Sequence, residues 1–149
     1  MTTQQDWIER DIWIDAPPAS VWAALVDSGE FGRWFGCVVD GPFTAGGEVT
    51  VSMPQYPDMK PFWLRPVELV PPHRFAFDWP AGDPAATRSP DEPATRVTVT
   101  LTAERGGTQV RVVEAGFAAL PAEMAERKLR DNTRGWEIQL GNLAAHVAP

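Results

Sequence analysis

The end of the chain carries the longest helical pattern in the sequence, and this pattern limits what the rest can fold into. Trp136, Leu140, Leu143 and Val147 follow one another at steps of four, three and four residues, which places them on one face of an α-helix. Pro121 is a residue type that commonly opens a helix, so we expect one helix from there to about Val147, roughly 40 Å long. An apolar face of this length must be buried against another large apolar surface.

The segments before this helix alternate between apolar and polar residues, which is typical of β-strands. The clearest case is the hairpin at 95–115, where two strands rich in β-branched residues meet at Gly106 and Gly107. Pro66 lies within another strand and predicts an edge or a bulge there, because proline has no N–H to donate. The expected strands are 7–14, 48–53, 62–70, 75–79 and the two strands of the hairpin.

Two short helices are expected between the first strand and the others. Pro17 and Pro18 precede an apolar helical pattern, Ser28 is expected to cap the second helix, and Gly36 is expected to end it. A polar, Pro-rich loop is expected at 81–94. The order of elements predicts a single α+β domain, in which a curved antiparallel six-stranded sheet wraps around the long C-terminal helix.

Composition argues against several classes of function. The net charge of −7 opposes a general affinity for nucleic acid or for an anionic membrane surface, because like charges repel. The N-terminus does not have the pattern of a signal peptide, and no apolar run approaches the roughly 20 residues of a membrane span, so we expect a cytoplasmic protein. Cys37, His73 and His146 give no metal-ligand spacing, and no nucleotide-binding motif is present. We therefore expect neither a metal nor a cofactor.

Six segments of the chain resemble a known superfamily and occur in its order. They are "APPASVWAAL" at 16–25, "RWF" at 33–35, "PPHRFAFDW" at 71–79, "TRVTVTL" at 95–101, "GGTQVRVVEAGF" at 106–117 and "GWEIQLGNL" at 135–143. The chain resembles the SRPBCC superfamily of START-like, helix-grip proteins, and within it the bacterial proteins similar to the C-terminal domain of the activator of heat-shock protein 90 ATPase. This resemblance implies a helix-grip fold. It leaves the function open, because the superfamily includes carriers, cyclases, hydrolases and co-chaperones.

Two carboxylates in strand segments are candidates for general acid–base chemistry, because a cavity can tune such a group for proton transfer. Glu114 shares the parity of Val110 and Val112 and is expected on their face of the sheet. The resemblance implies that a polar residue in this "ExGF" position stands near the pocket. The interpretation that we favour for such a carboxylate is instead a structural salt bridge at a sheet edge, for which the candidate partners are Arg65, Arg74 and Arg111. Asp78 alternates with aromatic residues and is expected on the solvent face.

Aromatic and polar side chains from several segments are expected to line a space between the sheet and the long helix. Each ring, taken alone, is better explained as plain core, and it is the set of rings that indicates a lined space. Asn132 and Thr133 fall on the inward arc of the helix, where they would bond either a ligand or the neighbouring backbone. Gly135 is expected to let the helix approach its neighbours closely. The predicted ligand-binding residues are Trp22, Trp34, Phe62, Phe75, Phe77, Trp79, Glu114, Asn132, Thr133, Trp136 and Leu140.

These expectations favour a protein that binds a small, mainly hydrophobic molecule without covalent chemistry. One alternative is an enzyme of the cyclase or hydrolase kind that uses Glu114 or Asp78 as a general base. A chaperone-associated interaction module, implied by the resemblance, is the other. The expected partner is a small hydrophobic molecule rather than nucleic acid or a membrane, and the chain is expected to be a monomer or a homodimer.

Overall fold

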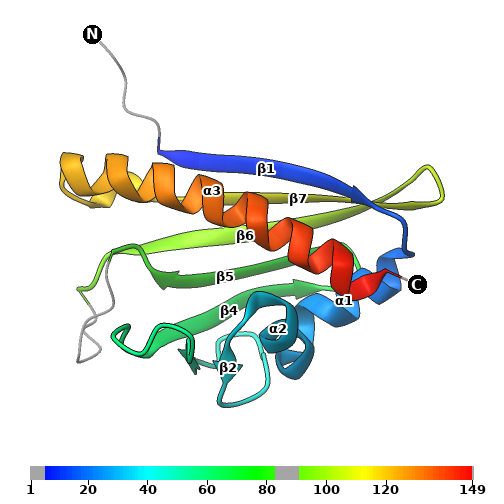
Figure 1. Cartoon of the computed structure of the whole chain (residues 1–149), viewed down its shortest axis with the longest axis horizontal. Coiled ribbons are helices and arrows are strands. Elements are labelled where there is room, and N and C mark those ends of the chain that lie inside the picture. The colour runs from blue at the N-terminus through cyan, green and yellow to red at the C-terminus, as the bar shows by residue number, and fades with distance from the viewer. Residues whose placement is uncertain (1–5, 83–90, 149) are drawn as a thin grey trace, which may run out of the picture.

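The computed structural model describes residues 6–82 and 91–148, and in these ranges the chain forms one antiparallel seven-stranded sheet with a long helix packed on it (Figure 1). The strand order is β1-β7-β6-β5-β4-β3-β2. The strands are β1 Trp7–Ile14, β2 Val38–Val39, β3 Val49–Ser52, β4 Phe62–Val70, β5 Arg74–Pro80, β6 Ala94–Glu104 and β7 Gly107–Ala115. The helices are α1 Pro18–Val26, α2 Ser28–Phe35, the 3-10 turn η1 Phe117–Ala119 and α3 Ala122–Val147.

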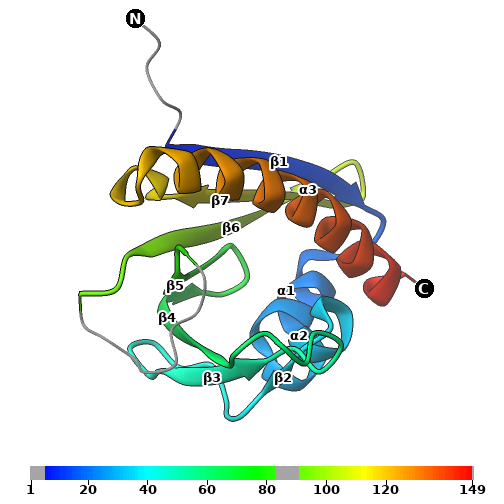
Figure 2. The same ribbon diagram turned by 60° about the vertical axis from the view of Figure 1, so that its left-hand side comes forward.

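The sheet curls strongly, and α3 lies along its concave side beside β1 and β7 (Figure 2). The strands from β4 to β2 curve away from the helix, and α1 and α2 close one end of the curl (Figure 2). This is the expected α+β helix-grip arrangement. The prediction of six strands lacked β2, which is only two residues long and pairs Val38 with Ser52 of β3. A strand this short has no periodicity that a sequence pattern can reveal.

The irregularity expected at Pro66 is confirmed as a bulge. The register between β4 and β5 shifts between Pro66, which lies opposite Phe77, and Glu68, which lies opposite Ala76. A proline cannot donate to the ladder, so the interruption falls where a hydrogen bond would be missing in any case.

The short helix α2 begins one residue earlier than expected. The side chain of Asp27, rather than that of Ser28, caps it by accepting the backbone N–H of Glu30 at 2.9 Å. At the other end Gly36 has a φ of 84°, a left-handed conformation that glycine adopts readily, and the helix ends there as predicted.

The core lies between the concave face of the sheet and the buried stripe of α3. Val110, Val112 and Glu114 of β7 all point to this face and are almost completely buried, as their shared parity predicted. The stripe of α3 that faces them consists of Ala125, Trp136, Leu140 and Leu143.

Two further sequence expectations concern the loop at 81–94 and membrane-spanning helices. The polar loop expected at 81–94 includes residues 83–90, which lie outside the described residues. Within residues 6–82 and 91–148, no helix has both the length and the apolar character needed to cross a bilayer.

Candidate functional site

A buried carboxylate lies at the centre of the contact between the sheet and α3. Glu114 is 1% exposed, and side chains from two strands and from the helix surround it. Its Oε2 accepts hydrogen bonds from Thr95 Oγ1 at 2.6 Å and from Trp79 Nε1 at 2.9 Å. Its Oε1 accepts from Trp136 Nε1 at 2.9 Å and from Asn132 Nδ2 at 3.2 Å. Glu114 therefore ties β5, β6 and α3 together through its two oxygens.

Glu114 is the acceptor in each of these four bonds. An indole N–H can donate but never accept, and one such group faces each carboxylate oxygen. A carboxylate that accepts about two bonds per oxygen has its hydrogen-bonding capacity largely filled. Four charge-assisted bonds offset part of the cost of burying this charge.

The favoured expectation, that Glu114 forms a salt bridge at a sheet edge, is wrong. None of the ion pairs among the described residues includes Glu114, and each of the three candidate arginines binds a different acid. Arg65 lies 3.7 Å from Asp78, Arg74 Nε donates to Glu68 at 2.9 Å, and Arg111 pairs with Glu9. These arginines project from the outer face of the sheet, whereas Glu114 projects from the inner face.

The two tryptophans that hold Glu114 stack on each other. The ring centroids of Trp79 and Trp136 are 5.8 Å apart and the ring planes differ by 25°. The ring of Phe35 meets both of them edge-on, at 6.1 Å from Trp79 and 6.4 Å from Trp136, and Phe62 meets Trp79 at 6.2 Å. Because the N–H groups point to one carboxylate, the orientation of both indoles is fixed.

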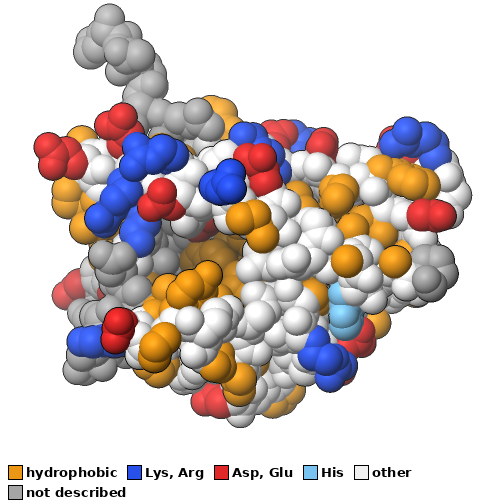
Figure 3. Space-filling model, viewed as in Figure 1, with side chains coloured by type: hydrophobic (Ala, Val, Ile, Leu, Met, Phe, Trp, Pro, Cys, Tyr) orange, Lys and Arg blue, Asp and Glu red, His pale blue; other side chains and the backbone are white. Residues whose placement is uncertain are grey.

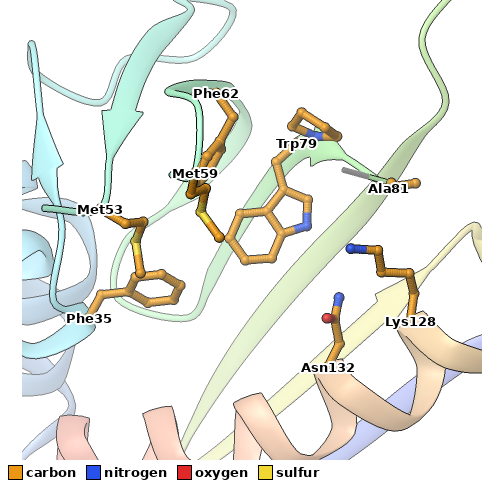
Figure 4. Close-up of a pocket in the computed structure, with 10 residues that line it drawn as sticks. Phe35, Met53, Met59, Phe62, Trp79, Ala81, Lys128 and Asn132 are labelled. Carbon is orange, nitrogen blue, oxygen red and sulfur yellow. The ribbon is translucent and has the colours of Figure 1, made fainter. Parts of the chain in front are cut away.

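Two adjoining pockets open beside this aromatic group. The larger has a volume of about 430 Å³ and the smaller about 200 Å³. Residues from α2, from the loop after β3, from β5 and from α3 line both of them, with Phe35, Met53, Met59, Trp79 and Asn132 in common. Figure 4 shows the thioethers and rings facing Asn132 and Lys128 of the helix, and Figure 3 shows a hollow with apolar side chains beneath α3.

A protein-family model matches residues 15–148 of the chain, under the description "Activator of Hsp90 ATPase homolog 1-like protein". The chain belongs to this family. Protein MLL2253 from Mesorhizobium loti has a TM-score of 0.76 at 21% identity, with 94% of this chain and 95% of that chain covered. The Aha1 dimer from Colwellia psychrerythraea has a TM-score of 0.70 at 17% identity, with 93% of each chain covered. At such identities these two structures support the fold alone.

Another structural match comes from a biosynthetic locus. DynU16, a protein of the dynemicin biosynthetic locus, has a TM-score of 0.73 at 25% identity, with 96% of this chain covered. This chain spans only 47% of the length of DynU16. No curated protein matches the chain.

In this member of the Hsp90-activator-like family, four of the predicted ligand-binding residues line the pockets. They are Phe62, Trp79, Asn132 and Trp136. Glu114 lies behind three of these four, bonded to the two indoles and to the amide. The remaining rings and Leu140 do not line either pocket: Trp34, Phe75, Phe77 and Leu140 are buried core, and Trp22 packs against the core while half-buried.

The two polar residues of α3 behave differently from each other. Thr133 Oγ1 donates to the backbone carbonyl of Leu129 at 2.5 Å, which is the neighbouring-backbone alternative. Asn132 instead points between Glu114 and the pocket. The close approach expected at Gly135 is wrong, because a Cβ placed there would meet no atom within 4 Å. Gly135 lies at the wall of the larger pocket and not at a tight helix contact.

The second candidate for acid–base chemistry, Asp78, is on the outer face of the sheet as expected. Arg96 donates to Asp78 through Nε at 2.9 Å and through a terminal nitrogen at 3.1 Å. This hydrogen bonding, together with the attraction between the charges, raises the pKa of the Arg96 guanidinium. Asp78 therefore forms a surface ion-pair network and does not face the pockets.

Several pocket residues were missed from the sequence. Tyr56 and Met59 belong to the loop after β3, whose sequence shows no periodicity, and both are largely exposed at the mouth. Phe35 is the last residue of α2, and its apolar character was the only available signal. Lys128 lines the smaller pocket and Gln139 the larger one. Within the described part of the chain, no group of three His, Cys, Asp or Glu side chains is placed to hold a metal ion.

Proposed function

We propose that this protein binds a small, mainly apolar molecule in the pocket between β5, the loop after β3 and α3, without forming a covalent bond to it. The observation that carries the proposal is a volume of about 430 Å³ walled by aromatic rings and thioethers. Small-molecule sites typically have volumes of roughly 300–1,000 Å³, mainly apolar walls and a few placed polar groups. Trp79 and Trp136 give the wall a fixed shape, since both indoles are held by Glu114.

The expected affinity is modest. A ligand that loses about 250 Å² of apolar surface to this pocket gains roughly 6 kcal/mol at 25 cal/mol per Å². The loss of translational and rotational freedom on association offsets part of this gain. The gross gain alone would correspond to a Kd of roughly 40 µM, so a simple apolar probe is expected to bind with a Kd between about 0.1 and 10 mM, and a ligand that also uses the polar groups is expected to bind more tightly.

The contacts of the two carboxylates argue against the enzyme alternative. A general base must reach the proton that it removes, but both oxygens of Glu114 are already hydrogen-bonded and the residue is 1% exposed. Asp78 is paired with Arg96 on the outer face. Glu114 is thus a positioning residue for the pocket wall rather than a group that touches the ligand.

A chaperone-associated role remains the other proposal that the family suggests. It requires a partner surface, and the family match and the shared fold do not identify one on this chain. If a pull-down at physiological salt recovers a heat-shock ATPase, and substitutions in the pocket do not abolish this recovery, the result would favour that role over ligand binding.

The test of ligand binding is a titration with the neutral fluorescent probe N-phenyl-1-naphthylamine, together with native mass spectrometry of freshly purified protein. Met59 and Ile138 are both exposed apolar residues, 42% and 53% respectively, but only Met59 lines the pockets. We expect saturable binding of one probe that Met59→Ala weakens several-fold and Ile138→Ala leaves unchanged. Equal effects of the two substitutions, or no saturable binding, would contradict the proposal.

The larger aromatic residue Trp136 is a less suitable target for this test. It is 6% exposed, stacks on Trp79 and donates to Glu114. Truncation of such a residue to alanine typically costs about 3–5 kcal/mol of stability. Trp136→Ala is therefore expected to lower stability and affinity together, and it cannot separate a core role from a binding role.

A further inference from the structure

We propose that the ligand of this pocket presents a hydrogen-bond donor, in its strongest form a protonated amine, and that the pocket disfavours a carboxylate on the same apolar body. This inference rests on the proposed ligand-binding function and specifies the chemical class of the ligand. It follows from the direction in which the polar groups of the pocket wall point.

The donors of the inner wall are turned away from the pocket. The N–H groups of Trp79 and Trp136 and the hydroxyl of Thr95 all donate to Glu114. The amide of Asn132 has only one orientation that suits its partner, because a carboxylate accepts and the NH₂ group must face it. Its Oδ1, an acceptor, is then left for the pocket, and Figure 4 shows this oxygen on the side of Asn132 away from Lys128.

The other polar groups of the larger pocket lie at its rim or are bonded to other residues. Gln139 also lines this pocket, but its NH₂ group donates to the carbonyl of Phe35 at 2.9 Å. Its oxygen accepts from Asn142 Nδ2 at 3.1 Å, so each end of this amide has a partner and one N–H of its NH₂ group is left over. Asp131 adds a carboxylate at the rim of the same pocket, where its side chain is exposed and lies 3.9 Å from Arg130 Nε. The hydroxyl of Tyr56 can donate, but this residue is 55% exposed at the mouth.

The electrostatics of the wall favour a positive charge in the same place. Glu114 carries a buried negative charge without an ion pair among the described residues, and low-dielectric surroundings extend its influence. The faces of aromatic rings are themselves negative and attract ammonium groups. A cation near Trp79 would therefore meet both the ring face and the field of the carboxylate behind it.

The basic residues at the mouth oppose this preference only weakly. Lys128 lines the smaller pocket, and between 123 and 137 the helix α3 has four basic residues against four acidic ones. Arg127, Arg130 and Arg134 are exposed, and salt screens exposed charges over a Debye length of about 8 Å at physiological ionic strength. Lys128 is half-buried, so its opposing effect is tested directly by substitution below. The buried charge of Glu114 is screened much less. The preference for a cation should thus persist when salt is raised.

The experiment compares three probes that share one apolar body: 4-phenylbutylamine, 4-phenylbutan-1-ol and 4-phenylbutyrate. Each displaces N-phenyl-1-naphthylamine from the unmodified protein at pH 7, in 0.15 M and in 0.5 M NaCl. We expect the amine to bind about tenfold more tightly than the alcohol, and the alcohol more tightly than the carboxylate, as cation–π and charge-assisted contacts of ordinary strength imply. The order is expected to be the same at both salt concentrations.

Two variants test which polar groups of the pocket produce the preference for the amine. Asn132→Leu removes Oδ1 and is expected to reduce the ratio of amine to alcohol affinity several-fold; because this ratio compares two ligands on the same variant, a general loss of affinity does not change it. Lys128→Met removes the cation of the smaller pocket and is expected to keep or increase this ratio. Far-UV circular dichroism checks that each variant is folded. If a variant is unfolded, the order in which the unmodified protein binds the three probes still decides the proposal.

The outcomes distinguish this inference from the proposed function. A carboxylate that binds as tightly as the amine at both salt concentrations overturns the inference while ligand binding stands, and so does an unchanged ratio in folded Asn132→Leu. If neither the alcohol nor N-phenyl-1-naphthylamine binds, the proposed function itself fails, and the inference fails with it.

Discussion

Replacing Glu114 by glutamine tests whether the buried carboxylate organises the pocket wall. The change keeps the shape of the side chain but exchanges one acceptor oxygen for an NH₂ group. The new amide and that of Asn132 can rotate to suit each other, and the hydroxyl of Thr95 can turn to accept, but an indole N–H cannot. In one orientation of Glu114→Gln the new NH₂ group faces the N–H of Trp136, which then lacks its acceptor. In the other it faces the N–H of Trp79, which keeps Thr95 Oγ1 as an acceptor at 3.0 Å, while the Thr95 hydroxyl loses the oxygen to which it donates. Either orientation therefore leaves one buried donor without its present acceptor.

The expected magnitude follows from this count. One buried donor without an acceptor costs about 1–3 kcal/mol, and exchanging charge-assisted bonds for neutral ones adds about 1 kcal/mol. Relief from burying a charge offsets part of the sum. We therefore expect Glu114→Gln to lower the free energy of unfolding by about 2–4 kcal/mol. A matched control is Glu9→Gln, which alters an exposed pair with Arg111 and should cost less than about 1 kcal/mol.

The assay combines urea unfolding with near-ultraviolet circular dichroism. Unfolding followed in the far ultraviolet gives the free energy, and the near-ultraviolet spectrum of the native state reports the stacked pair of Trp79 and Trp136. We expect Glu114→Gln to change that spectrum and Glu9→Gln to leave it unchanged. A Glu114→Gln protein that is as stable as the unmodified one, with the same near-ultraviolet spectrum, would refute the reasoning, because the indoles would then not depend on the carboxylate.

Three further predictions concern residues outside this network. Gly135→Ala should raise the free energy of unfolding by about 1 kcal/mol, since an added Cβ meets no atom within 4 Å and alanine favours the helix; a lower melting temperature would contradict this. Asp27→Ala should cost about 1 kcal/mol by removing the cap of α2, and an unchanged urea midpoint would count against the cap. Burial raises the pKa of the Cys37 thiol from 9.0 to about 11, so native protein at pH 8 should not react with a disulfide reagent until urea unfolds it. Because this pKa is higher in the folded state, its contribution to stability is complete below pH 9 and declines as the pH rises toward 11, and urea titrations across that range measure the decline.

The fold was predictable because each element carries its own local signal. The alternation of the hairpin at 95–115 and the apolar stripe of α3 are patterns within single segments, and together they determine which faces are buried. The same logic placed Glu114 correctly on the inner face of β7. It failed for β2, which is too short for a period, and for the cap of α2, where Asp27 and Ser28 are adjacent and both suit the position.

The site was less predictable because its contacts join segments that are distant in the sequence. Trp79 and Trp136 could be named as inward-facing rings, but nothing in either segment indicates that both donate to Glu114. Their shared acceptor depends on which turn of α3 lies over Glu114 when the helix packs on the sheet. Residues of the loop after β3, such as Met59, lack a periodic pattern altogether, and Arg65, Arg74 and Arg111 were credible partners for a carboxylate until the structure placed them on the other face.

The choice of a carboxylate at position 114 has a consequence for the proposed function. A buried polar cluster can often be replaced by well-packed apolar residues with little loss of stability, so joining β7 to α3 does not by itself require a carboxylate. What Glu114 does, and an apolar residue could not do, is to draw the N–H groups of Trp79, Trp136 and Asn132 away from the pocket. With an apolar side chain in its place, those donors would seek partners elsewhere, the pocket among them, and the wall would become attractive to anions. In the proposed site, the carboxylate behind the wall thereby determines which chemical groups the wall can accept, although Glu114 itself lines neither pocket.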